Sequence, residues 1–337
     1  MKPEHSSPDN TYRRIAVVLS TFNGERFLPD LLESILQQSW PYWDLWVRDD
    51  GSTDGTLKIL ESYRDRMSDD ISKNRMYLTT GKNIGVPYSF FSCLSEITKE
   101  YDGFAFCDQD DIWLPGKLER AAEYARIRNK PGLPYLYHGR QILTDSENGA
   151  GFESPLPRRT GLSNAIIQNQ VVGCSMVIDN RLRQLILDGL RRCPDKDIGA
   201  IIMHDWWCYL VASAFGVTEF DSEPVIRFRR HQHSKTPGSG SIGKAWARRA
   251  GGLGKRSWRI RHIMDQVELF HRLYLNEEAG LSDYKISSEK RQLINAWLEL
   301  KDAGWKKRLH YFFTGPHKRS GQLETLLFRI MILINRY

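Results

Sequence analysis

The hydrophobic positions in the first third of the chain change repeatedly between two periods. Apolar runs rich in β-branched residues, such as "RIAVVLSTF", are typical of buried strands. The segments between them repeat apolar residues at helical spacing, as Leu28, Leu31, Leu32 and Ile35 do in "LPDLLESILQQ". We therefore expect strands at 14–22 and 75–80, and two further strands that begin at residues 43 and 103. Helices are expected at 28–38, 56–67 and 87–101.

This alternation predicts an α/β fold with a Rossmann-like, mostly parallel central sheet and helices on both faces. In such sheets ligands bind outside the carboxyl ends of the strands. Polar residues follow three of the expected strands, at 21–23, at Asp49 and Asp50, and at 108–111. The sequence thus predicts one polar rim that binds a ligand. At Asp49 and Asp50 the pattern also fits ordinary turn chemistry, because Asp-Gly is a common turn dipeptide.

The rest of the chain divides at a flexible, polar stretch. Apolar segments at 135–143, 171–179, 206–216 and 224–230 continue the first domain, and "TPGSGSIG" at 236–243 is a suitable boundary. Beyond it the pattern is helical and basic, most clearly at 259–275. We expect an N-terminal tail at 1–13, a catalytic domain at 14–235 and a helical, basic C-terminal extension at 236–337.

Positive charge is concentrated near this boundary. The formal net charge is +7, and residues 224–264 hold eleven Lys or Arg and no acidic residue. Such a stretch can bind nucleic acid, lie on an anionic membrane surface, or form a solvated face without a partner. We favour the membrane surface and expect no nucleic acid partner, because short apolar helical segments lie beside the charge.

Other features bear on the cellular location. The five cysteines show no CxxC spacing, which fits a reducing cytoplasm rather than a disulfide framework. The first ten residues lack an apolar signal region, and no apolar run reaches the roughly 18 residues of a membrane span. We expect a cytoplasmic protein that is peripheral at the inner face of the plasma membrane.

The stretch "FAFCDQDDIWLPGKLERA" carries the clearest chemistry. Asp108, Asp110 and Asp111 lie within four residues, and their mutual repulsion is costly unless a cation lies among them. Carboxylates suit Mg²⁺ or Mn²⁺, shared with the oxygens of a diphosphate, and such an ion stabilises a departing nucleotide. An acidic surface turn is the alternative. Neither GxGxxG nor GxxxxGK[ST] occurs at the expected strand ends, which argues against a dinucleotide-binding or P-loop site.

Several motifs, taken together and in order, resemble a known family. "VVLSTFNGERFLPDLLESILQQ", "VRDDGSTDGT" and "FCDQDDIWLPGKL" resemble the inverting glycosyltransferases of family 2, which have the GT-A fold. Further on, "GCSMVID", "HDWWCYLVASAFG" and "FRRHQHSKT" resemble the rhamnosyltransferase-like subgroup, which builds cell-surface polysaccharides such as O-antigen. The resemblance runs from about residue 14 to residue 235.

The resemblance implies a role for individual residues. Asp110 is expected nearest the metal, Asp205 as the general base, and His231 as a further metal ligand, with His233 left as an alternative. Phe228 replaces the Tyr that is usual in the family. The expected nucleotide-sugar contacts are Thr21, Asn23, Glu25, Asp50 and Asp108. The expected acceptor or sugar pocket is Gly173, Cys174, His204, Trp206 and Trp207. Trp206 and Trp207 also fit a place in the hydrophobic core, and His204 and His231 also fit ordinary surface or core positions.

The implied enzyme is a metal-dependent inverting hexosyltransferase. Its donor would be a dTDP- or UDP-sugar, most specifically dTDP-rhamnose, and its acceptor a glycan, in particular a lipid-linked one. One positioned carboxylate suffices as base, because the hydroxyl loses its proton mostly as the new bond forms. Two rivals remain at this point. One is a metal-dependent phosphohydrolase with Asp108 as nucleophile, and the other is a nucleic-acid-binding protein that uses residues 224–264.

Overall fold

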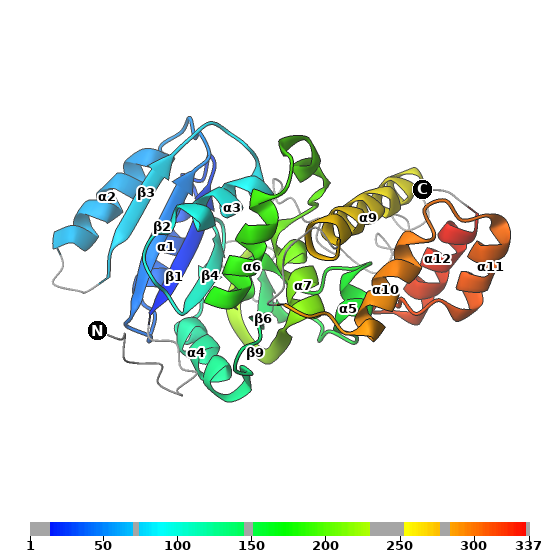
Figure 1. Cartoon of the computed structure of the whole chain (residues 1–337). Coiled ribbons are helices and arrows are strands. Elements are labelled where there is room, and N and C mark those ends of the chain that lie inside the picture. Colours follow the sequence, from blue (N-terminus) through cyan, green and yellow to red (C-terminus); the bar gives the residue numbers. More distant parts are fainter. Residues whose placement is uncertain (1–13, 70–73, 145–150, 230–252, 277–283, 335–337) are drawn as a thin grey trace, which may run out of the picture.

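The computed structural model describes residues 14–69, 74–144, 151–229, 253–276 and 284–334. Within these residues nine strands form one sheet, flanked by helices, and further helices extend from one end of it (Figure 1). The strand order is β3-β2-β1-β4-β8-β6-β9-β5, with β7 paired to β6. The expected tail at 1–13 and the expected boundary at 236–243 lie outside the described residues.

The first half of the sheet has the predicted parallel arrangement. Strands β1 (Ile15–Thr21), β2 (Trp43–Asp49), β3 (Met76–Thr80) and β4 (Gly103–Asp108) alternate with helices α1 (Leu28–Leu36), α2 (Thr56–Asp69) and α3 (Val86–Glu96). Helix α3 is five residues shorter at its C-terminus than expected, because Ile97 already has an extended backbone conformation with ψ 105°.

Strand register confirms that the polar residues share one edge of the sheet. Thr21 pairs with Asp49 of β2, and Ser20 pairs with Asp108 of β4. The last residues of three neighbouring strands therefore lie side by side. This edge is the predicted polar rim.

The second half of the sheet is mixed. Strand β8 (Met176–Asp179) is antiparallel to both β4 and β6 (Tyr135–Thr144), whereas β9 (Val217–Arg229) runs parallel to β6. The short strands β5 (Ile112–Trp113) and β7 (Phe152–Glu153) add antiparallel pairs with β9 and β6. Because β5 pairs with the end of β9, the chain just after the acidic cluster is held against Ile226 and Arg227.

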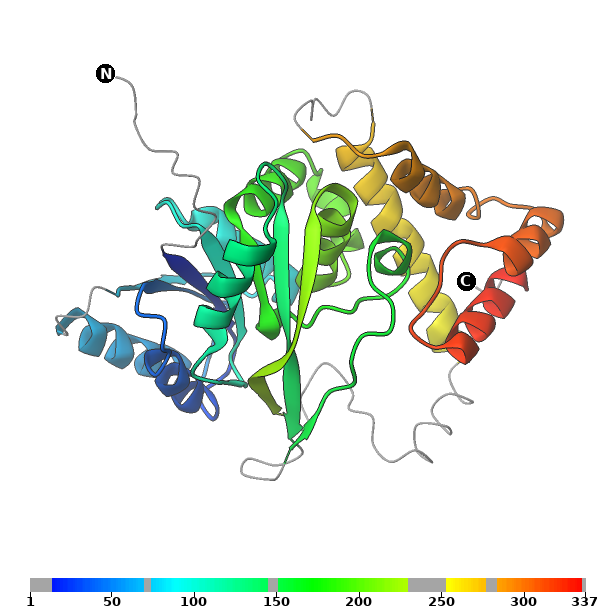
Figure 2. The ribbon, with the colours of Figure 1, turned by 90° about the horizontal axis from the view of Figure 1, so that it is seen from below.

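Alternation along the strands divides the core into two layers, as the expected helices on both faces require. Along β1, Ala16 and Val18 face one layer, while Ile15, Val17 and Leu19 face the other. Helices α3, α6 (Asn180–Arg191) and α7 (His204–Phe215) cover the first face. Helices α1, α2 and α4 (Lys117–Arg128) cover the second (Figure 2).

The C-terminal helices extend the first layer. Helix α9 (Leu253–Tyr274) covers the expected amphipathic segment 259–275 except its last residue, and it packs Phe270 and Tyr274 against Trp207 and Phe215 of α7. Helices α10 (Ser288–Leu298), α11 (Trp305–Thr314) and α12 (Gln322–Leu333) continue away from the sheet (Figure 1). None of the helices in the described ranges is long and apolar enough to cross a membrane.

Candidate active site

The loops that follow β1 and β2 are joined through three of the expected nucleotide-binding residues. Asn23 Oδ1 accepts a hydrogen bond from the Thr53 backbone N–H at 2.8 Å, and Glu25 Oε2 accepts one from Gly55 at 2.9 Å. The Thr21 hydroxyl donates to Asp49 at 2.9 Å. These side chains lie at the rim as expected, and in this structure they align the two loops with each other.

Asp50 is buried at the same rim and has several partners. It forms an ion pair with Arg48 and accepts hydrogen bonds from the backbone N–H groups of Ile84 and Gly85 at 3.0 and 2.9 Å. The carboxylate therefore fixes the loop between β3 and α3. Sequence reasoning did not single out Arg48, which also contacts Ser89. The direct nucleotide contact of Asp50 stays a prediction.

Gln109, the residue inside the acidic cluster, ties this cluster to the β1–α1 loop. Its side-chain amide accepts from the Phe22 backbone N–H at 2.8 Å and donates to the Phe22 carbonyl at 3.0 Å. A Cβ atom on Gly24 would collide with this amide, so the pairing requires glycine at 24. Sequence reasoning missed this role, because nothing local distinguishes a linking Gln from a solvated one.

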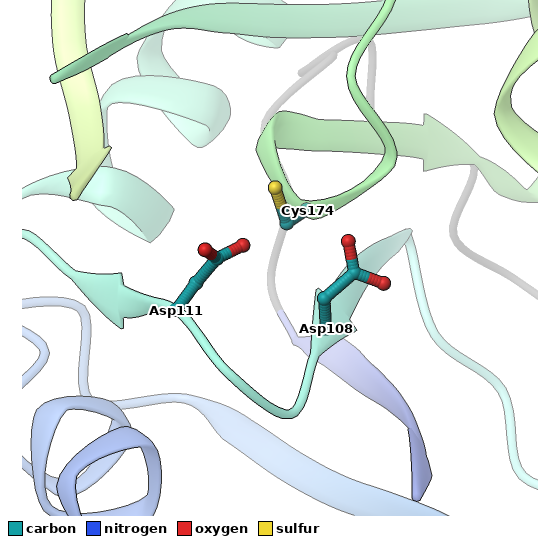
Figure 3. Close-up of side chains that lie close together, drawn as sticks. All are labelled: Asp108, Asp111 and Cys174. Carbon is teal, nitrogen blue, oxygen red and sulfur yellow. The ribbon is translucent and has the colours of Figure 1, made fainter. Parts of the chain in front are cut away.

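Two carboxylates and a thiol converge after β4. Asp108, Asp111 and Cys174 offer ligand atoms that lie within 4.8 Å of one another (Figure 3). Asp111 is fully buried. Its Oδ1 accepts from the Arg229 backbone N–H at 3.2 Å, and its Oδ2 has no hydrogen-bond partner among the described residues. The sequence predicted the cluster, but the close pair is Asp108 and Asp111, with Asp110 on the turn between them.

The cluster is electrostatically strained. Burial and then the charges of Asp110 and Asp205 raise the pKa of Asp108 to about 7. Burial and then the charges of Asp110 and Asp108 raise the pKa of Asp111 well above its usual value. Burial also raises the pKa of the Cys174 thiol, which therefore stays protonated. A cation among these carboxylates would favour their ionised forms.

Lys117 supplies a buried positive charge behind the cluster. Its Nζ donates to the Cys174 carbonyl at 2.6 Å and lies 3.2 Å from the centroid of the Trp113 ring. Burial lowers the pKa of Lys117 to about 8, against the opposing effect of nearby acidic groups. Sequence reasoning missed this residue too, because a lysine in the first turn of a helix is ordinarily solvated.

Asp205, the expected base, lies in the first turn of α7 and faces the acidic cluster. Its Oδ1 accepts from the Trp206 backbone N–H at 2.6 Å, and its Oδ2 accepts from Gly173 at 3.1 Å. Burial raises the pKa of Asp205 to about 6, while these hydrogen bonds oppose the shift. The carboxylate is thus ionised at neutral pH and still basic enough to accept a proton.

The expected acceptor pocket is divided by the structure. Gly173 and Cys174 border Asp205, and Trp206 is half-buried nearby, with its indole N–H donating to the Ala165 carbonyl at 2.6 Å. His204 and Trp207 are both buried, and their place in the pocket stays a prediction. The His204 ring stacks on Phe90 at 4.1 Å, and burial lowers its pKa to about 3. Trp207 is fully buried in the layer shared with α9.

The expected metal ligand His231 and its alternative His233 lie outside the described residues. The strand that leads to them ends beside the acidic cluster. Arg229, the last residue of β9, donates from Nε to the Asp110 carbonyl at 2.6 Å and pairs with Asp30 at 2.6 Å. The role of His231 as a metal ligand stays a prediction.

The part of the chain that forms this rim and the acidic cluster matches a known protein family in sequence. Residues 16–132 match the model of glycosyl transferase family 2. These residues hold the two joined loops and the acidic cluster, so this part of the chain is a family 2 glycosyltransferase domain. The protein is a glycosyltransferase with the GT-A fold, and the phosphohydrolase and nucleic-acid-binding alternatives are set aside.

Relatives and solved structures agree with this assignment. The chain is 25% identical over 256 residues to the dTDP-rhamnosyl transferase RfbG of Shigella flexneri, covering 71% of this chain and 80% of RfbG. It is 25% identical over 169 residues to WfgD of Escherichia coli, a UDP-Glc:α-D-GlcNAc-diphosphoundecaprenol β-1,3-glucosyltransferase, covering 50% and 60%. The crystal structure of S. aureus TarS 1–349 with UDP-GlcNAc has a TM-score of 0.53 at 16% identity, covering 96% of this chain and 89% of that one.

Proposed function

We propose that this enzyme transfers a sugar from a nucleoside diphosphate to a glycan hydroxyl with inversion at the anomeric carbon. The observation that carries the proposal is the convergence of two chemical groups. Asp205 from α7 and the acidic cluster after β4 meet at Gly173 and Cys174, and the charge of Asp205 contributes to the raised pKa of Asp108. An inverting transfer requires a base for the acceptor hydroxyl close to the site that holds the leaving nucleoside diphosphate.

The residues of the cluster fit a divalent cation. Asp108, Asp110 and Asp111 offer oxygen donors, and a buried Asp111 oxygen lacks a partner among the described residues. Oxygen ligands favour Mg²⁺ or Mn²⁺, whereas the protonated Cys174 thiol is a poor ligand for either. When bound, the ion would neutralise the donor diphosphate and the charge that develops on the leaving group. Asp110 and His231 remain our proposed ligands alongside Asp108 and Asp111.

The donor that we propose is dTDP-rhamnose, with a UDP-sugar as the alternative. The relative RfbG is named for transfer from a dTDP-rhamnosyl donor. WfgD is named for UDP-glucose, and the TarS structure contains UDP-GlcNAc. The nucleotide would lie along the rim formed by the β1–α1 and β2–α2 loops, near Thr21, Asn23, Glu25 and Asp50.

The acceptor that we propose is a lipid-linked glycan used in surface polysaccharide synthesis, such as O-antigen. Support comes from WfgD, whose named acceptor is a diphosphoundecaprenol-linked sugar. Such a substrate lies at the inner face of the plasma membrane, so the enzyme would act there as a peripheral protein. The acceptor would enter beside Trp206 and Gly173, where the Asp205 carboxylate can receive the proton of its hydroxyl.

A donor screen tests this function. Binding and slow hydrolysis of dTDP-rhamnose, UDP-glucose and UDP-GlcNAc are measured by calorimetry and by nucleotide release, with and without Mn²⁺. We expect one donor to bind in a Mn²⁺-dependent way, and Asp110→Ala to weaken that binding. Asp65→Ala, at an exposed position in α2, is the matched control. If none of these donors binds, or if binding ignores Mn²⁺, the proposal fails.

A further inference from the structure

The hairpin of α11 and α12 carries an exposed apolar face. On α11 the exposed residues recur every four positions, so they lie along one side of the helix. The side chains of Trp305 and Phe313 are 67% and 70% exposed. We call the following set the apolar face: Trp305, Leu309 and Phe313 of α11 with Leu323, Leu326 and Ile330 of α12.

This face is separate from the one that holds the hairpin in the protein. On α12 the opposite side packs Phe328 against Trp297, with ring centroids 5.7 Å apart, and buries Met331 and Ile332. Tyr311 is the buried aromatic residue of α11, and Arg329 of α12 donates to the Phe312 carbonyl at 3.0 Å. The hairpin is therefore anchored without the apolar face. Large exposed apolar residues clustered in this way mark an interaction surface.

The charge of the hairpin favours an anionic partner. Residues 305–334 include six Lys or Arg and a single acidic residue, Glu324. On α11, Lys306 comes directly after Trp305, and His310 comes directly after Leu309. Lys318 lies in the loop to α12, and all three polar side chains are exposed. Trp beside Lys on an amphipathic helix is typical of segments that lie in the interface of an anionic bilayer.

The same charge disfavours two other occupants. In a symmetric dimer through this face, Lys306 and Lys318 of one copy would approach those of the other. Residues 230–252 of this chain hold five Lys or Arg and no acidic residue, so they would be repelled as well. We propose that the apolar face inserts into the surface of an anionic lipid bilayer.

Hydrogen bonds connect this surface to the acceptor side of the active site. The α11–α12 loop accepts from the Ser163 hydroxyl at Pro316 and from the Asn164 amide at Lys318, at 2.8 and 3.2 Å. The Ser320 backbone N–H donates to Gln168 Oε1 at 2.8 Å. A few residues further along that segment, Gly173 binds Asp205. Docking of the hairpin would thus hold Asp205 at a defined distance from the lipid surface. This consequence rests on the proposed lipid-linked acceptor, whereas the docking itself does not.

Vesicle flotation of the full chain tests the docking. Vesicles of phosphatidylcholine alone are compared with vesicles that also contain phosphatidylglycerol. We expect binding to the anionic vesicles that weakens as salt is added. The double variant Leu309→Ser, Phe313→Ser should lower the partition coefficient at least about tenfold. Its matched control is Ile127→Ser, Leu156→Ser, because these side chains are 57% and 52% exposed away from the hairpin.

A second pair of variants tests the charge. Lys306→Glu, Lys318→Glu should reduce binding to anionic vesicles several-fold, whereas Lys58→Glu, Lys130→Glu, at exposed positions of the N-terminal domain, should leave it unchanged. Donor hydrolysis in solution should be the same in all of these proteins. If the wild-type protein does not hydrolyse the donor, that result counts against the proposed function. It does not affect the conclusion about docking.

Two results would overturn the docking proposal. One is equal binding of wild type and hairpin variants to anionic vesicles. The other is absence of binding to the anionic vesicles. If the chain then forms a concentration-dependent dimer on size-exclusion chromatography that Phe313→Ser abolishes, a second copy of the chain is the occupant.

Discussion

Replacing Asp205 with Asn removes the proposed base while keeping the size and shape of the side chain. The variant should bind the donor as the wild type does, because Asp205 lies on the acceptor side of the cluster. Transfer to the acceptor should fall by about 10²–10⁴-fold, the usual contribution of a positioned base. The wild-type rate should rise with pH and level off above about 6, because burial raises the pKa of Asp205 to about 6.

The structure also sets two opposing effects of this change on stability. The shift of the Asp205 pKa from 3.8 to about 6 means that the ionised side chain costs the folded state about 3 kcal/mol at neutral pH. That cost is absent below the unfolded pKa, grows as pH rises from about 4 to about 6, and is then constant. Asn removes it.

The opposing effect comes from the backbone. The Gly173 and Trp206 N–H groups bind different carboxylate oxygens, and the single Asn oxygen can serve one of them. The other buried donor then costs about 1–3 kcal/mol. Because the two effects nearly cancel, the variant should unfold within about 2 kcal/mol of the wild type at neutral pH. At about pH 4 it should be the less stable protein, since the wild type is then protonated.

Three measurements check this reasoning. Urea unfolding at both pH values gives the free energies, calorimetry gives donor affinity, and a radiolabelled donor with an acceptor glycan gives the transfer rate. Asp65→Asn, a change at an exposed aspartate of α2, is the matched control and should alter none of them. Transfer retained by Asp205→Asn would refute the assignment of the base. Lost donor binding would show that Asp205 acts on the donor instead.

The remaining predictions concern the acidic cluster and its supports. Asp111→Asn should weaken Mn²⁺ binding at least about tenfold by electron paramagnetic resonance, because it removes a buried oxygen anion; unchanged affinity would exclude Asp111 as a ligand. Lys117→Met removes a buried cation whose carbon chain already packs on Trp113, so Mn²⁺ should bind several-fold more tightly, and weaker binding would contradict an electrostatic role. Gly24→Ala should raise the KM for donor with little change in the unfolding free energy, because the methyl group displaces only the flexible end of the Gln109 side chain. A wild-type KM in that variant would mean that the displaced amide does not shape the donor site.

The polar rim could be predicted from the sequence because its cause is local. The strands are short apolar runs that end in Thr21, Asp49 and Asp108, and parallel strands in register bring their ends together. The neighbourhood of Asp205 followed from resemblance alone. It depends on α7 packing across the end of β4 and on Gly173, which has no room for a side chain because a Cβ would lie 2.6 Å from His204 Nε2.

Positions that depend on distant packing could not be read from the chain. Trp206 and Trp207 are adjacent, yet one borders the site and the other is in the core, because α9 supplies Phe270 from more than 60 residues away. His204 resembles a site histidine in sequence, but Phe90 covers it. Lys117 is buried because the Trp113 ring of β5 and the Cys174 carbonyl of η1 (Gly173–Ser175) lie against its ammonium group. Local periodicity contains none of this information.

The amide pair between Gln109 and Phe22 has a thermodynamic consequence. It makes the turn that carries Asp108 and Asp110 and the loop that borders the nucleotide rim one mechanical unit. If ordering of this unit strengthens the binding of both the ion and the nucleotide, the two binding equilibria are coupled. The factor by which the ion raises nucleotide affinity then equals the factor by which the nucleotide raises ion affinity. A non-hydrogen-bonding residue such as Leu at 109 would then diminish both factors by the same amount.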